Sequence, residues 1–131
     1  MKPDPKKMVP GYLTAAEEAA RGAQLLAEQG NRYGAYLLSQ SLEQIAKAVR
    51  VHQGEYPTLS HSIEQLVSGL PNPEPWSTRL LGLRELNKYA TSFRYPTTGG
   101  RLDPGPSADK VTEYVQKLTA LIELARKELL V

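Results

Sequence analysis

Apolar residues recur along most of the chain at the three- and four-residue spacing of an α-helix, and glycine and proline interrupt this pattern at intervals. The clearest stretch follows Ser107, a residue that can cap the start of a helix. Its apolar positions are Val111, Tyr114, Val115, Leu118, Leu121, Ile122, Ala125 and Leu129. This stripe predicts a long amphipathic helix in the C-terminal part of the sequence.

A first helix is predicted from about Leu13 to Gln29. Thr14 and Glu17 have the spacing of a capping box, in which each side chain binds a free backbone N–H of the first turn. Gly30 ends the pattern, because glycine readily adopts the left-handed conformation that closes many helices. The stripe between these residues is mostly alanine, so we expect a neighbouring helix to approach closely.

A second long helix is predicted from Asn31 or Arg32 to about Gln53, where Gly54 stops it. Its apolar stripe consists of Leu38, Leu42, Ile45 and Val49. A short third helix is predicted to begin at Ser60, which we expect to be its cap.

A fourth long helix is predicted from Trp76 to about Arg94. Its apolar positions are Trp76, Leu80, Leu83, Leu86 or Asn87, and Ala90. Pro96 disfavours helical geometry at Tyr95, which fixes the C-terminal end of this helix. The Gly- and Pro-rich stretch from Thr97 to Pro106 is expected to be an exposed, mobile loop.

Together these elements predict an all-α fold, an antiparallel up-and-down helical bundle of four long helices plus one short helix. We expect a polar N-terminal extension over residues 1–12 and a single bundle domain over residues 13–131. A chain of 131 residues is long enough for one domain with its own hydrophobic core. No strand-like alternation and no internal repeat accompanies the helical pattern.

Composition narrows the classes of function. The absence of cysteine excludes disulfides and thiolate metal sites and suits a reducing cytoplasm. The 16 basic and 14 acidic residues give a net charge of +2, too small a field to steer a polyanion such as RNA. No apolar run is long enough to span a membrane, and the N-terminus lacks the pattern of a signal peptide. With two histidines and no cysteine, we expect neither a metal nor a cofactor.

Three short motifs follow one another along the chain: SLEQIAKAV (residues 41–49), TLSHSIEQL (58–66) and FRYP (93–96). In this order and spacing, and with the alanine-rich helix before them, they resemble the signature of HEPN domains over roughly residues 13–130. The resemblance implies a helical bundle with a glutamate and a lysine, here Glu43 and Lys47, on its second long helix. It also implies a tendency to dimerise.

The resemblance implies several kinds of function. Many HEPN proteins are metal-independent ribonucleases with an arginine followed, four to six residues later, by a histidine near a dimer seam. Others accompany a minimal nucleotidyltransferase, often as a toxin–antitoxin pair, and some are proposed to bind nucleotides. Neither His52 nor His61 has an arginine at the required spacing before it, and Arg94 has no histidine after it. We therefore expect no ribonuclease activity, no other enzymatic activity and no catalytic residue.

Glu43 and Lys47 are predicted to form an ion pair, since they lie four residues apart on one helix face. In solvent such a pair contributes only a few tenths of a kcal/mol. In the bundle interior or at a dimer seam, loss of one partner would cost about 3–5 kcal/mol. The pair is either structural or in contact with a ligand.

Four further residues are candidates for ligand contact. Arg94 and Arg101 flank a glycine-rich loop and could bind a phosphate, although a cation at a helix C-terminus also explains Arg94. Tyr33 and Tyr95 could stack on a base or lie at the edge of the core.

We predict a prokaryotic, cytoplasmic HEPN-domain protein that is not an enzyme. It is expected to form a homodimer and to bind a nucleotidyltransferase-like partner of the toxin–antitoxin type and a nucleotide. The residues predicted to bind nucleotide or partner are Glu43, Lys47, Arg94, Tyr95, Tyr33 and Arg101. Two alternatives stay open: an RNA-binding or RNA-cleaving HEPN toxin, and a purely structural homo-oligomer.

Overall fold

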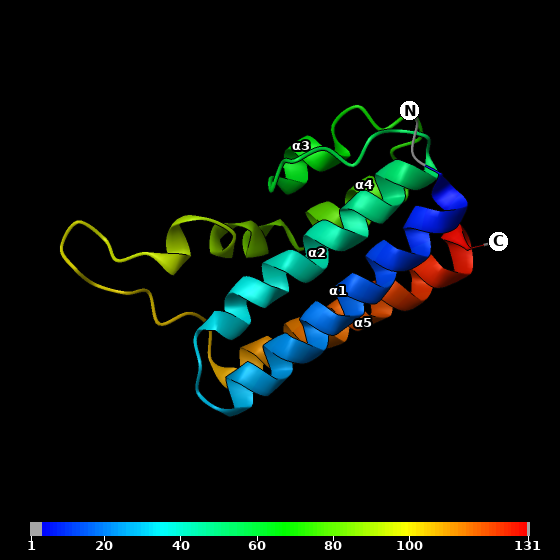
Figure 1. Cartoon of the computed structure of the whole chain (residues 1–131). Coiled ribbons are helices and arrows are strands. Elements are labelled where there is room, and N and C mark those ends of the chain that lie inside the picture. Colours follow the sequence, from blue (N-terminus) through cyan, green and yellow to red (C-terminus); the bar gives the residue numbers. More distant parts are fainter. Residues whose placement is uncertain (1–3, 131) are drawn as a thin grey trace.

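The computed structural model describes residues 4–130, and all regular structure within them is helical. Three long helices, α1 (Pro5–Glu28), α2 (Tyr33–His52) and α5 (Ala108–Leu129), lie side by side (Figure 1). Between α2 and α5 the chain forms the short helices α3 (Ile63–Val67), α4 (Trp76–Leu81), η1 (Arg84–Tyr89) and η2 (Ser92–Arg94). The all-α class is confirmed, whereas the predicted count of four long helices plus one short helix is wrong.

The predicted fourth long helix is broken after α4 into η1 and η2, which are 3-10 helices. Buried residues recur there at every third position, at Leu80, Leu83, Leu86 and Tyr89. That spacing matches the three-residue turn of a 3-10 helix better than the turn of about 3.6 residues of an α-helix. The sequence therefore contained the signal for this break, and the prediction of one continuous helix overlooked it.

Helix α1 begins well before the predicted start at Leu13. Asp4 caps it, since its side chain accepts a hydrogen bond from the backbone N–H of Lys6 at 3.1 Å. Thr14 and Glu17 lie inside the helix, so the predicted capping box is wrong. Residues 5–12 of the predicted polar extension are helical and place Val9 in the core, and residues 1–3 lie outside the described residues.

The cap of the short helix α3 is Ser62 rather than Ser60. The Ser62 hydroxyl accepts a hydrogen bond from the backbone N–H of Gln65 at 3.3 Å. Ser60 lies in the preceding loop, where its hydroxyl accepts from the backbone N–H of Ser62 at 3.0 Å. The predicted bounds of α2 are confirmed to within two residues, and the predicted cap of α5 at Ser107 is confirmed.

Helix α2 is the central helix of the bundle, with 12 of its 20 residues buried. Helix α1 approaches it closely, as its alanine stripe predicted. A Cβ atom on Gly34 would lie 2.8 Å from the backbone oxygen of Ala23, so only glycine fits at that crossing. The buried Ser41 hydroxyl donates to the backbone oxygen of Ala16 at 2.8 Å, a second direct link between the two helices.

Residues 95–106, termed the arm, project away from the bundle between η2 and α5 (Figure 1). Arg32 holds the base of the arm, donating to the backbone oxygen of Phe93 and, at 2.8 Å, to that of Asp103. The backbone N–H of Thr97 donates to the oxygen of Arg101 at 2.8 Å and closes the tip. The base of the arm is thus attached to Arg32, and its tip is closed by a turn within the arm, contacts that its Gly- and Pro-rich composition did not predict.

Candidate functional site

One side of α2 carries polar side chains at the three- and four-residue spacing of a helix face. These are Tyr36, Gln40, Glu43 and Lys47, here termed the polar stripe. All four are partly or fully buried. The loop before α3 contacts the C-terminal half of the stripe through His61, and η2 contacts its N-terminal half through Arg94.

In the C-terminal half of the stripe, both carboxylate oxygens of Glu43 have partners. Oε2 lies 2.9 Å from Lys47 Nζ, and Oε1 accepts a hydrogen bond of 2.6 Å from His61 Nδ1. The side chains of Glu43 and Lys47 are only 4% and 13% exposed, whereas that of His61 is 54% exposed. The predicted ion pair therefore exists and faces the interior. These three residues, the Glu43 cluster, tie the loop before α3 to α2.

In the N-terminal half of the stripe, Arg94 stacks on aromatic rings. Its Cζ atom lies 4.9 Å from the centroid of the Tyr36 ring and 5.5 Å from that of Tyr95. Within residues 4–130, the Nε atom is shielded from solvent without a hydrogen-bond partner, and the guanidinium forms no ion pair. Cation–π contacts stabilise the charge, but they leave the N–H donors without an oxygen acceptor.

The other four partly buried arginines of residues 4–130 show that Arg94 is exceptional, because each of them donates to oxygen. Backbone carbonyls accept from Arg32 and Arg50, and the carboxylates of Glu128 and Glu17 accept from Arg79 and Arg126. An arginine fork is suited to planar oxyanions, so the free fork of Arg94 indicates a site for an external anionic group.

A second buried donor within residues 4–130 also has no partner, the Nε2 atom of Gln40. Gln40 follows Tyr36 by four residues, and side chains on a helix lean towards its N-terminus. The Gln40 amide therefore extends towards the turn of α2 that carries Tyr36, whose ring Arg94 of η2 covers. Sequence analysis did not identify Gln40, although its spacing from Tyr36 and Glu43 placed it on the stripe.

The remaining predicted site residues divide into two groups. Tyr33 is 44% exposed and packs edge-on against Tyr36, with ring centroids 6.5 Å apart, and Tyr95 is 62% exposed beside Arg94. Tyr36 and Arg94 thus bring both predicted tyrosines to one surface. Arg101 lies at the closed tip of the arm, where its backbone contacts Thr97, and it joins neither group of stripe contacts.

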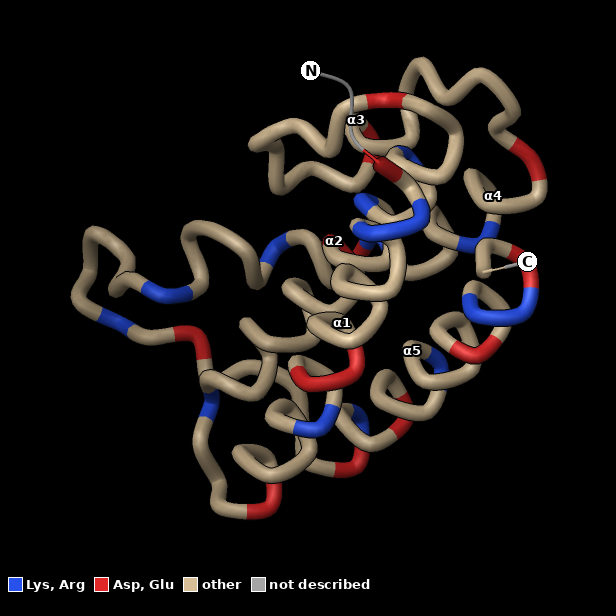
Figure 2. Tube along the Cα trace, turned by 45° about the vertical axis from the view of Figure 1, so that its right-hand side comes forward, with Lys and Arg blue, Asp and Glu red and all other residues tan. Residues whose placement is uncertain are grey.

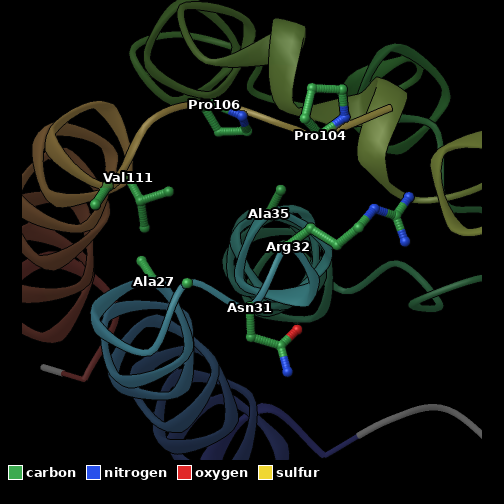
Figure 3. Close-up of a pocket in the computed structure, with 9 residues that line it drawn as sticks. Ala27, Asn31, Arg32, Ala35, Pro104, Pro106 and Val111 are labelled. Atoms are coloured by element: carbon green, nitrogen blue, oxygen red, sulfur yellow. The ribbon is translucent and has the colours of Figure 1, made fainter. Parts of the chain in front are cut away.

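A cleft of about 140 Å³ lies where the α1–α2 turn meets the base of the arm (Figure 3). Its lining includes Ala27, Ala35, Pro104, Pro106 and Val111. The polar ends of Asn31 and Arg32 point away from the apolar side chains that line it (Figure 3). Ligand pockets usually measure about 300–1,000 Å³. This cleft is therefore too small for a nucleotide.

Charges outside the stripe serve contacts between helices. Basic residues (Lys and Arg) and acidic residues (Asp and Glu) are mixed along α1 and α5 (Figure 2). The Arg126 guanidinium holds the pKa of the Glu17 carboxyl below its usual value, through a hydrogen bond and through its charge. Burial, with the nearby Glu85 carboxylate, raises the pKa of Tyr114 to about 12. These contacts join α5 to α1 and to η1.

Within residues 4–130, no three or more metal-ligating side chains gather in one place. None of the described helices is both long and apolar enough to cross a membrane.

Comparison with known proteins identifies the family. The family profile of the HEPN domain matches residues 10–129, nearly the whole chain and all three sequence motifs. No curated protein and no solved structure matches the chain. A family match of this extent identifies the bundle, and the chain belongs to the HEPN domain family.

Proposed function

We propose that this HEPN domain is a non-catalytic recognition module. It forms a homodimer and binds a nucleotidyltransferase-like partner, as in toxin–antitoxin pairs, together with a nucleotide. The observation that supports recognition is Arg94, a partly buried cation without an oxygen partner beside the exposed Tyr95 ring. An arginine in this state favours an anionic group supplied by another molecule. The class of the partner rests on the family resemblance.

The Glu43 cluster supports the module rather than its ligand contacts. Both oxygens of Glu43 and the ammonium of Lys47 are already bound to groups of the same chain. Breaking either contact to reach a ligand would leave a charge buried in the bundle. We therefore assign recognition to Arg94 and the two exposed tyrosines and assign Glu43 and Lys47 to the support of α2.

Affinity purification from the native host tests the partner directly. The tagged protein, its Arg94→Met/Tyr95→Ala variant and an Arg84→Met control are purified, and bound proteins are identified by mass spectrometry. Arg84 is exposed on η1, so its variant controls for the loss of one positive charge. We expect a nucleotidyltransferase at near-equal amount with wild type and control, and a strongly reduced amount with the Arg94 variant. A wild-type protein that is purified alone contradicts partner binding.

Light scattering separates recognition from a purely structural role. The proposal predicts a dimer that also retains its partner or nucleotide. A stable homo-oligomer that retains neither would support the structural alternative, and a monomer would exclude self-association.

One observation favours the ribonuclease alternative. The Glu43 carboxylate fixes the His61 ring through Nδ1, which is the way carboxylates orient catalytic histidines, and the side chain is half exposed. Wild type and His61→Ala should be incubated with labelled RNA, with and without EDTA. Cleavage by wild type that is lost in His61→Ala would establish a ribonuclease and refute the non-catalytic proposal. Intact RNA in every sample is the result that we expect.

A further inference from the structure

Two buried side-chain donors at the polar stripe, Arg94 Nε and Gln40 Nε2, lack a hydrogen-bond partner within residues 4–130. We propose that Arg94 and Gln40 form one oxyanion site, which binds the phosphate of the nucleotide while Tyr95 stacks on its base. This inference rests on the proposed function, because it specifies the contacts of the nucleotide proposed there. It assigns to Gln40 a role that the sequence motifs do not indicate.

The unpaired donors of Arg94 and Gln40 meet the same face of α2. Arg94 Nε and Gln40 Nε2 are the buried side-chain nitrogens of residues 4–130 that lack a hydrogen-bond partner. Arg94 covers the Tyr36 ring, and Gln40 lies one turn further along the same face of α2. An acceptor group bound between Arg94 of η2 and Gln40 of α2 would satisfy both donors.

No carboxylate of residues 4–130 forms an ion pair with the Arg94 guanidinium. The carboxylate on the same stripe, Glu43, is occupied by Lys47 and His61. The carboxylate of the arm, Asp103, accepts a hydrogen bond from the backbone N–H of Gly105 at 2.8 Å. Neither carboxylate is bonded to Arg94, so the guanidinium keeps an uncompensated positive charge that favours an anion.

The donors and the neighbouring Tyr95 ring together favour the phosphate of a nucleotide over other anions. A phosphate presents several oxygens and can accept from the arginine fork and the glutamine amide together. Tyr95 directly follows Arg94, and its ring is 62% exposed. Aromatic rings beside a phosphate site stack on bases with little sequence preference. A nucleotide uses both features, whereas a simple carboxylate uses only the cation.

The outer guanidinium nitrogens make the first contact with the ligand. Arg94 Nε and Gln40 Nε2 are shielded in the free protein, and Tyr95, at the start of the arm, forms part of the surface beside them. Movement of the Tyr95 ring onto the base opens the shielded donors to the phosphate. Binding is therefore expected to change the NMR signals of the Arg94 Nε–H and of the Gln40 side-chain amide.

Equilibrium binding at low salt tests the proposal with ATP, AMP, inorganic phosphate and adenosine as probes. The test variants are Arg94→Lys, which keeps the charge but loses the fork, and Gln40→Ala. The matched controls are Arg84→Lys and Gln116→Ala, both at exposed positions. Thermal unfolding confirms that each variant is folded, and the side-chain NMR signals provide a readout within the wild-type protein.

We expect ATP and AMP to bind wild type and controls alike and to bind each test variant about tenfold or more weakly, the usual effect of losing a hydrogen bond to a charged group. Adenosine, which has no phosphate, should bind all variants equally, and inorganic phosphate should compete with AMP. Equal ATP binding by all variants overturns the phosphate site but leaves nucleotide binding intact. Failure of wild type to bind any nucleotide overturns both the phosphate site and the proposed nucleotide binding. If the wild-type protein binds a short RNA but does not bind ATP, the proposal is also overturned.

Discussion

The two halves of the polar stripe both contain buried polar side chains, but only one half pairs them with groups of the same chain. In the Glu43 cluster, a carboxylate, an ammonium and an imidazole meet within the same chain, and both carboxylate oxygens are occupied. At Arg94 and Gln40, towards the N-terminal end of the same stripe, two N–H donors have no acceptor in the described chain. Charges that satisfy one another stabilise the fold, whereas donors without a partner indicate recognition. The sequence motifs alone do not distinguish these roles.

Glu43→Leu should reduce the stability of the folded protein more than any other single substitution considered. It leaves the Lys47 ammonium, only 13% exposed, without its counter-charge. The free energy of unfolding, measured with urea, should fall by about 3–5 kcal/mol. The double variant Glu43→Leu/Lys47→Met should recover most of that loss, because apolar side chains replace both charges. A single variant that loses less than about 1 kcal/mol, as surface pairs do, would show that the cluster is not a structural contact.

Alkaline pH should break a contact between α5 and η1, that of Tyr114 with Glu85, and leave the stripe intact. The pKa of Tyr114 is raised to about 12, mainly by burial and secondly by Glu85. The folded chain keeps this proton when the unfolded chain releases it. The contribution of Tyr114 to the free energy of unfolding is therefore fully present below about pH 10 and is lost as the pH rises to about 12. The loss should approach 2–3 kcal/mol, since one pKa unit corresponds to about 1.4 kcal/mol.

Tyr114→Phe provides the comparison for this alkaline loss. Urea unfolding between about pH 9 and pH 12 should show a steeper decline for wild type than for Tyr114→Phe, since phenylalanine has no proton to lose. The Glu43→Leu/Lys47→Met variant should decline like wild type, because distant sites act independently. Parallel curves for wild type and Tyr114→Phe would exclude Tyr114 as the cause.

His61→Ala should have a smaller effect than loss of Glu43. The variant removes the partner of Glu43 Oε1 but leaves the carboxylate paired with Lys47, so the cost should be about 1–3 kcal/mol. His52→Ala, at an exposed position, is the matched control and should change stability little. Hydrogen exchange should also become faster in the loop before α3. Equal behaviour of the two alanine variants would contradict a role for His61 in holding that loop.

Arg94→Met should change stability least, by no more than about 1 kcal/mol. It removes cation–π contacts, but it also removes a buried donor that has no acceptor, so the two effects offset each other. Urea unfolding in the absence of ligand measures this difference. A loss above about 3 kcal/mol would show that Arg94 is structural, like the Glu43 cluster.

The sequence predicted the parts of the fold that local periodicity controls. Helices α2 and α5 have unbroken apolar stripes. The predicted bounds of α2 and the predicted start of α5 after Ser107 agree with the structure to within two residues. The start of α1 was signalled by Asp4 and Pro5, a capping residue and a proline suited to the first turn. The capping-box spacing of Thr14 and Glu17 concealed that signal.

The site was less predictable because its contacts join distant parts of the chain. The Glu43–Lys47 pair follows from helical spacing alone, and the structure contains it. No local rule connects Glu43 with His61, or Tyr36 with Arg94, because these contacts depend on how the short helices pack against α2. Whether the Gln40 amide lacks a hydrogen-bond partner depends on its burial, which only the folded structure reveals.

The most direct test of the division between the two halves of the stripe is urea unfolding of wild type and Arg94→Met, with and without saturating ATP. A ligand that binds only the folded state stabilises it by about 2.7 kcal/mol at 100 times its Kd. The account predicts nearly equal stabilities without ATP and an ATP-dependent increase in wild type alone. Equal stabilisation of both proteins by ATP, or a large loss of stability in Arg94→Met without ATP, would contradict it.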